Sequence, residues 1–116
     1  MKVYLAGPMR GRPHFNFPAF FAAAAKLRAD GHEVFNPAEY DNEKAGADIS
    51  TGNESGDEDV AAARFGYDRR KSLEADLAWI CREADAIALL PGWGESLGAL
   101  AEYWAARACD LEIITL

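Results

Sequence analysis

The stretch DAIALLPGWGESLG, residues 85–98, decides the fold. After its leading aspartate it begins with a continuous apolar run, which is typical of a central strand in a parallel sheet. A glycine-rich turn follows at residues 91–96, and apolar residues with helical spacing continue over residues 96–108. We therefore expect a strand, a turn and a helix in direct succession. The inward face expected for this helix consists of Leu97, Leu100, Ala101, Trp104 and Ala108.

The remaining elements are predicted by similar patterns on either side of this unit. Three further short apolar strand patterns lie at residues 2–6, 32–36 and 111–116. Two further helical patterns lie at residues 16–31 and about 69–83. Strands that alternate with helices in this way predict a parallel sheet with helices on both faces. We expect a single α/β domain over residues 1–116, a Rossmann- or flavodoxin-like three-layer sandwich with four to five strands.

Residues 41–59 differ from the rest of the chain in charge. They contain seven acidic residues against one lysine, so they hold net −6 of the formal net charge of −7. Glycine and serine are frequent there, and no apolar periodicity runs through the segment. We therefore expect an acidic, flexible insertion at about residues 41–66, with no core of its own.

The composition also excludes several classes of protein. An acidic chain binds polyphosphate backbones poorly, so we expect no nucleic acid polymer as a partner. No apolar run is long enough to cross a bilayer, and the first residues lack the pattern of a signal peptide. Cys81 and Cys109 have neither disulfide-framework nor zinc-ligand spacing. We therefore expect reduced thiols, no zinc site, no membrane partner and a cytoplasmic location.

Ligands of such folds bind outside the carboxyl ends of the strands, where the loops at residues 7–14 and 91–96 are expected to lie. The second loop leads into a helix N-terminus, whose free N–H groups and partial positive charge suit a phosphate. Ser96 adds a hydroxyl group there, and Gly98 permits close approach of a ligand to the backbone. The alternative is an ordinary turn in which Ser96 only caps the helix. Trp93, in the turn itself, could stack on a base.

Four other residues are candidates for chemistry. Glu102 lies four residues after Gly98, about 6 Å further along the same helical face, and could instead be a solvated helix glutamate. Asp76 flanks the apolar stripe of its helix, where it either serves a function or stabilises the helix dipole. Tyr4 lies in the first strand and could simply be a core residue. Arg10, in the loop after that strand, could meet an anion or be solvated.

Three motifs occur in a fixed order along the chain. The first is VYLAGPMR at residues 3–10, a strand with a tyrosine followed by Gly-x-x-Arg. The second is DLAW at residues 76–79, with Asp85 and a strand after it. The third is SLGALAE at residues 96–102, similar to Ser-x-Gly-x-Gly-x-Glu but with Leu100 at the second glycine. In this order they resemble the nucleoside 2-deoxyribosyltransferase superfamily, including its deoxynucleoside 5′-monophosphate N-hydrolase branch.

The resemblance implies cleavage or transfer at the N-glycosidic bond of a nucleoside or nucleotide. Glu102 would be the nucleophile that forms a covalent glycosyl-enzyme, and Tyr4 would hydrogen-bond to it. Asp76 would orient the substrate or handle the proton delivered to the departing base. An oxocarbenium-like sugar needs such a carboxylate nearby, and no metal or other cofactor is required. The residues implied in substrate binding are Gly7, Arg10, Ser96 and Gly98, of which the last three would take the 5′-phosphate.

The resemblance also bears on assembly and origin. A homodimer or larger homo-oligomer is implied, with Tyr103 and Trp104 as candidate interface residues. Chains of this length with NPAE at residues 36–39 and LPGW at residues 90–93 resemble a phage-associated group of uncharacterised function.

Two other functions remain open at this point. Phosphoribohydrolases carry a PGGxGTxxE loop, which Pro91-Gly92 resembles, although Ala99 stands at the position of the glutamate. A non-catalytic module that binds or senses nucleotides on the same fold would keep Arg10 and Ser96 and would have no use for Glu102.

Overall fold

Four parallel strands form the central sheet in the order β2-β1-β3-β4. The computed structural model describes the whole chain, residues 1–116. The strands are β1 (Lys2–Ala6), β2 (Glu33–Phe35), β3 (Ala86–Leu89) and β4 (Glu112–Thr115). Because β2 lies on one side of β1 and β3 on the other, the strand order reverses between β1 and β3. Open parallel sheets bind their ligands at such a switch point.

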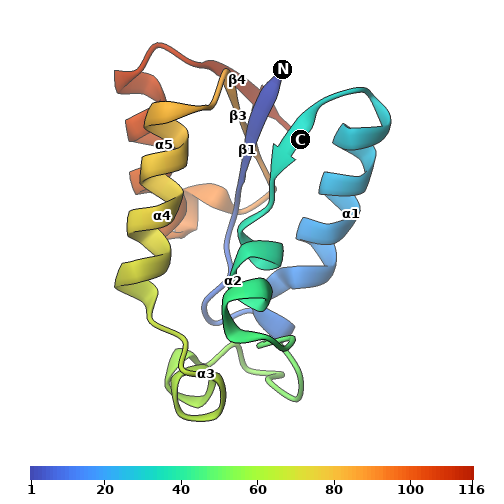
Figure 1. The fold of residues 1–116 in the computed structure, drawn as a ribbon, viewed down its shortest axis with the longest axis vertical. Coiled ribbons are helices and arrows are strands. Elements are labelled where there is room, and N and C mark those ends of the chain that lie inside the picture. The colour runs from blue at the N-terminus through green and yellow to red at the C-terminus, as the bar shows by residue number, and fades with distance from the viewer.

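Five helices complete a three-layer sandwich, which confirms the predicted Rossmann- or flavodoxin-like fold. They are α1 (Phe17–Ala29), α2 (Pro37–Ala45), α3 (Glu58–Phe65), α4 (Arg69–Arg82) and α5 (Leu97–Ala108). Short 3-10 helices at Pro13–Asn16 and Trp93–Glu95 precede α1 and α5. Figure 1 shows α1 on one side of the sheet, α4 and α5 on the other, and α3 beyond the carboxyl end of β1.

The pleat of β1 divides the buried core into two clusters. Val3 and Leu5 belong to a cluster of 14 buried residues with the apolar side chains of α1. Tyr4 and Ala6 belong to a cluster of 7 with residues of α4 and α5. Successive side chains of a strand point to opposite faces, so this division follows from the sequence alone. The side chain of Tyr4 therefore lies under α4 and α5.

The inward face predicted for α5 is wrong. The buried residues of this helix are Ala99, Glu102 and Ala106, whereas Leu97 and Trp104 are 74% and 61% exposed. Small side chains let a helix approach a sheet closely, and this alanine-rich helix has alanines on every side. The large apolar residues were therefore a poor guide to its buried face. As a result, a carboxyl group faces the sheet while a leucine and a tryptophan face solvent.

The flexible insertion predicted at residues 41–66 is instead packed against the domain. The segment contains the end of α2 and all of α3, and it adds Ile49 and Ala61 to the larger core cluster. Its polar residues serve as caps, since Asp57 accepts a hydrogen bond at the start of α3 and both helices end at a left-handed glycine. The sequence pattern did not predict these two helices, because their capping residues have the composition of a loop.

Backbone hydrogen bonds tie this segment to the loop after β1. The amide of Gly11 donates to Gly56 O at 2.9 Å, and the amide of His14 donates to Asn53 O at 2.9 Å. Gly56 has a φ of +64°, and a Cβ there would lie 2.3 Å from the carbonyl oxygen of Arg12. Only glycine permits this close approach. The segment therefore closes over the loop at the carboxyl edge of the sheet.

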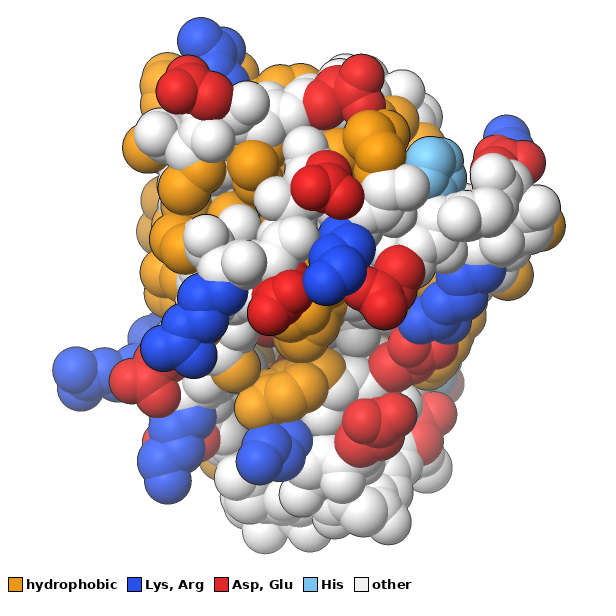
Figure 2. Space-filling model, turned by 45° about the horizontal axis from the view of Figure 1, so that its top comes forward, with side chains coloured by type: hydrophobic (Ala, Val, Ile, Leu, Met, Phe, Trp, Pro, Cys, Tyr) orange, Lys and Arg blue, Asp and Glu red, His pale blue; other side chains and the backbone are white.

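The surface is mixed in character. Figure 2 shows acidic and basic side chains interspersed over one face, with hydrophobic side chains along the edge where Figure 1 places α4 and α5. None of the helices combines the length and the apolar content that crossing a bilayer requires. Cys81 and Cys109 are exposed free thiols.

Candidate active site

A cavity of about 520 Å³ lies at the carboxyl edge of the sheet, lined by the loops after β1 and β3 and by helices α2 to α5. This is the region of the switch point between β1 and β3, and the volume suits a small-molecule ligand. The polar and charged side chains that line the cavity belong to Arg10, Asp41, Glu58, Tyr67, Arg69, Arg70, Ser72, Asp76, Ser96 and Glu102.

Glu102 is held inside the protein by a tyrosine of the central sheet. The hydroxyl group of Tyr4 donates a 2.8 Å hydrogen bond to Glu102 Oε2, so the contact that the resemblance implied is present. Glu102 is 7% exposed, and Tyr4 is completely buried beside the rings of Phe35 and Trp79. Burial and the charge of Glu102 raise the pKa of Tyr4 well above its ordinary value, which keeps the hydroxyl group a donor. Glu102 therefore has a fixed position at the cavity wall.

Asp76, on α4, faces the same cavity. It is 7% exposed, and its Oδ1 atom is buried without a hydrogen-bond partner. An unpaired buried carboxyl oxygen costs free energy, and such groups are uncommon in folded proteins unless a function retains them. The side chain is therefore placed to receive a proton or a donor group of a ligand.

The two carboxyl groups titrate as a pair. The pKa of Glu102 is raised well above its ordinary value, first by burial and then by the charge of Asp76. Burial raises the pKa of Asp76 to about 7, and the charge of Asp41 adds to this rise. Both groups are buried beside another acidic side chain, so the ionisation of one carboxyl group opposes the ionisation of its neighbour. Burial therefore favours retention of a proton within the pair.

Asp41 is a buried cavity residue that the sequence did not reveal. It lies on α2 and accepts a 2.9 Å hydrogen bond from the hydroxyl group of Ser72, while burial raises its pKa to about 6. Asn36 is the residue that could have indicated this position from the sequence. It follows β2 and caps α2, and α2 carries Asp41 at the carboxyl edge of the sheet. No group of three or more His, Cys, Asp or Glu side chains is arranged to hold a metal ion.

The predicted phosphate seat at the start of α5 faces the cavity. Ser96 accepts a 3.2 Å hydrogen bond from the amide of Ala99, so it caps the helix, and it also lines the cavity. The space beside Gly98 is open, since a Cβ there would meet only Ser96 Oγ at 3.9 Å. Gly7 also lines the cavity and is needed for packing, because a Cβ there would lie 2.7 Å from Leu90 Cβ. Ser96 therefore caps the helix, and the backbone at Gly98 is left open on the cavity side.

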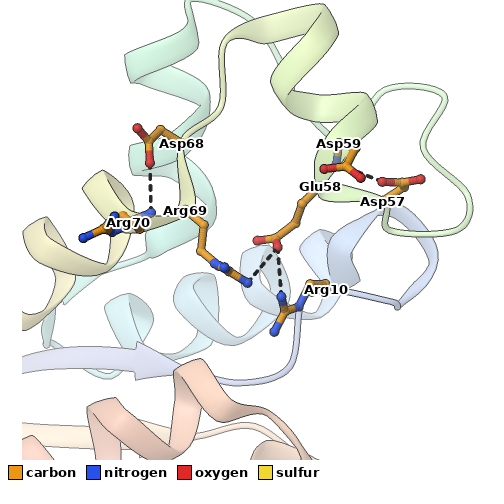
Figure 3. A network of polar contacts seen from close by, with 7 residues as sticks. All are labelled: Arg10, Asp57, Glu58, Asp59, Asp68, Arg69 and Arg70. Atoms are coloured by element: carbon orange, nitrogen blue, oxygen red, sulfur yellow. Dashed lines mark hydrogen bonds and ion pairs between the residues drawn. The ribbon is translucent and has the colours of Figure 1, made fainter.

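Arg10 lines the mouth of the cavity together with residues that the sequence did not single out. Its Nη1 atom lies 3.2 Å from Glu58 Oε1, and Arg69 Nη1 lies 3.4 Å from the same oxygen. Figure 3 shows both guanidinium groups directed at this carboxylate, which belongs to the first turn of α3. The basic side of the cavity therefore includes a residue of α4 as well as the predicted Arg10.

The structure does not bring Trp93 into the cavity. Its ring packs against Tyr103 with a centroid separation of 4.7 Å and lies against the smaller core cluster. Stacking of a substrate base on Trp93, as predicted, does not fit this position. The tryptophan is instead held by α5, because the 3-10 turn at residues 93–95 folds back on that helix.

These features define the chain as a Rossmann-like α/β domain with a buried carboxyl pair in a cavity at the carboxyl edge of its sheet. The chain belongs to the family described as a domain of unknown function, DUF4406, which matches residues 1–115. No curated protein and no solved structure matches the chain.

The raised pKa of Asp76 predicts a pH-dependent change in stability. Its pKa in the folded protein is about 7 against 3.8 ordinarily, so the protonated form favours folding and this contribution is lost as pH rises through that window. We expect Asp76→Asn to raise the free energy of unfolding by about 3 kcal/mol at about pH 8, and by much less at about pH 4. Denaturant titrations at both pH values measure this difference.

The matched control is Glu74→Gln, an exposed position on the same helix, which we expect to change stability little at either pH. If Asp76→Asn instead lowers the free energy of unfolding at about pH 8, the ionised Asp76 carboxylate does not destabilise the folded protein, and the prediction is wrong.

Proposed function

We propose that this protein cleaves the N-glycosidic bond of a nucleoside or nucleoside 5′-monophosphate through a covalent intermediate on Glu102. The proposal takes its chemistry from the nucleoside 2-deoxyribosyltransferase superfamily, which the three sequence motifs resemble. The observation that carries it is a buried cluster in which Asp76 of α4 and Glu102 of α5 line one cavity, and Tyr4 of β1 donates a hydrogen bond to Glu102 from behind it.

The first half of the reaction forms a glycosyl ester. Tyr4 binds Oε2 of Glu102, so Oε1 is the oxygen assigned to attack the anomeric carbon of the sugar. As the new C–O bond forms, the C–N bond to the base breaks and its electron pair stays on the base nitrogen. The proton held by the carboxyl pair passes from Asp76 to the base. Asp76 is left ionised and the sugar is attached to Glu102.

The second half releases the sugar. A water molecule attacks the anomeric carbon, the ester C–O bond breaks, and its electron pair returns to Glu102. The proton of the water passes to Asp76, which restores the starting state. If a second base attacks in place of water, the product is a new nucleoside and the reaction is a transfer.

The protonation state of the pair fits this sequence of steps. One proton must be present on Asp76 while Glu102 is ionised, and the raised pKa of Asp76, about 7, supports its role as the proton donor near neutral pH. Burial makes the Glu102 carboxylate more basic and more nucleophilic than in water. A module that only binds nucleotides has no need for this cluster, whose burial opposes folding.

The proposal is tested by incubating the protein with a panel of nucleosides and deoxynucleoside monophosphates and measuring free base by chromatography. We expect Glu102→Gln to slow base release by about 10³-fold or more, because the nucleophile is lost. We expect Asp76→Asn to slow it by about 10²- to 10⁴-fold, the usual contribution of a general acid.

The control for these variants is Glu95→Gln, which changes an exposed carboxylate near α5 that lies outside the cavity and should leave the rate unchanged. Base release that persists in Glu102→Gln contradicts the mechanism. Binding of nucleotides without any release favours a sensing module.

The outward face of α5 supports a second proposal, a homodimer. Leu97 and Trp104 are seven residues apart, two helical turns, and therefore project on the same side. Hydrophobic side chains also gather along this edge of the molecule (Figure 2). Exposed apolar patches of this kind mark interaction surfaces, and a second copy of the chain would cover them.

We expect light scattering to give the mass of a dimer for the protein and of a monomer for Trp104→Glu, because the charge cannot be buried in an apolar interface. Phe21→Glu, which alters a partly exposed aromatic residue on α1 in the opposite layer, should leave the dimer intact. A monomeric wild-type protein contradicts this proposal.

A further inference from the structure

Two arginines converge on one carboxylate at the mouth of the cavity. Arg10 comes from the loop after β1, Arg69 is the first residue of α4, and Glu58 is the first residue of α3. Both guanidinium groups approach the same oxygen, Oε1 of Glu58, at 3.2 Å and 3.4 Å. All three residues line the cavity, and Figure 3 shows their side chains directed toward one another. A single acidic side chain therefore occupies the space between two basic ones.

The charges at this point are unequal. Neither Arg10 nor Arg69 has another ion-pair partner, so two positive charges face one negative charge. Arg70 also lines the cavity and has no ion pair. A phosphate monoester carries close to two negative charges near neutral pH and offers three oxygens to guanidinium donors. A phosphate at this position would match the arginines better than the carboxylate does.

The cavity is also lined by buried carboxyl groups. These groups belong to Asp41, Asp76 and Glu102, and a dianion would be repelled by any of them that is ionised. An anionic ligand therefore has one favourable orientation, with its phosphate at the arginines and its uncharged parts toward the carboxyl groups. In that orientation the sugar and base of a nucleotide lie on the side of Glu102.

Glu58 is held in place by its surroundings yet bound weakly by the arginines. Gly56, two residues earlier, is fixed against the backbone of Arg12, and Asp57 caps α3. The side chain of Glu58 is only 19% exposed, whereas those of Arg10 and Arg69 are about half exposed. Long ion pairs to exposed arginines contribute little to stability, so a competing dianion can replace the carboxylate.

We propose that Arg10 and Arg69 form the binding site for the phosphate of the substrate, and that Glu58 occupies this site as an internal competitor until a phosphate displaces it. The inference rests on the proposed function for the identity of the substrate, and it narrows that substrate to phosphorylated nucleosides. An uncharged nucleoside cannot displace Glu58, so the carboxylate acts as a filter against unphosphorylated ligands.

Inorganic phosphate is the probe that tests this site without any reaction. Calorimetric titration at about pH 7.5, where phosphate is largely dianionic, is carried out on the wild type, Glu58→Gln, Arg69→Gln and Arg10→Gln. We expect Glu58→Gln to bind phosphate about three- to tenfold more tightly, since the competing ion pairs are lost. We expect each arginine variant to bind it about tenfold more weakly.

The matched control is Asp59→Asn, which makes the same change in net charge one residue further along α3, where the side chain contacts neither arginine. An equal gain in affinity for Asp59→Asn and Glu58→Gln would show a general charge effect and overturn the inference. Phosphate affinity that is unchanged in Arg69→Gln would also overturn it.

The outcomes separate this inference from the proposed reaction. Phosphate binding that follows the expected order, with no base released from any nucleotide, supports the anion site while the reaction fails. Base released equally well from nucleosides and from their monophosphates, in both the wild type and Glu58→Gln, contradicts the filter while the reaction stands.

Discussion

The hydrogen bond from the hydroxyl group of Tyr4 to Glu102 is the interaction on which the rest of the site depends. It joins the central strand to the last helix across the smaller core cluster. The helix can approach the sheet this closely because alanines at positions 99 and 106 lie on either side of the glutamate. Tyr4 is the middle residue of β1, next to the reversal of strand order between β1 and β3. The strand order and this hydrogen bond together therefore fix the position of the Glu102 carboxylate.

The cavity is a place where folding and function oppose each other. Three carboxyl groups are buried around it, and burial raises the pKa of each of them. A structure selected only for stability would replace them with apolar or amide side chains. The cost is limited because Glu102 accepts a hydrogen bond from Tyr4 and Asp41 accepts one from Ser72. Their retention is the physical reason to regard the cavity as a site for chemistry.

The strands and the helices α1, α4 and α5 were predictable because apolar periodicity is a local property of the sequence. The contact between Tyr4 and Glu102 was expected only from the family resemblance, because each residue read alone also fits an ordinary core or surface position. The segment at residues 41–66 was not predictable, because capping residues have the composition of a loop. For that reason neither Asp41 nor Glu58, the carboxylate between the two arginines, was predicted as a site residue. Alanines on every side of α5 hid its buried face.

In the proposed reaction, Glu102 becomes covalently attached to the sugar of the substrate. The most direct test uses a nucleotide analogue with fluorine at the 2-position of the sugar, which slows release of the glycosyl-enzyme by destabilising the oxocarbenium-like transition state. Mass spectrometry of the quenched and digested protein then locates the adduct. We expect a mass increase equal to the fluorinated sugar phosphate on the peptide that contains Glu102. The same peptide of Glu102→Gln should show no increase. Base release without any adduct, or an adduct on another residue, would contradict this mechanism.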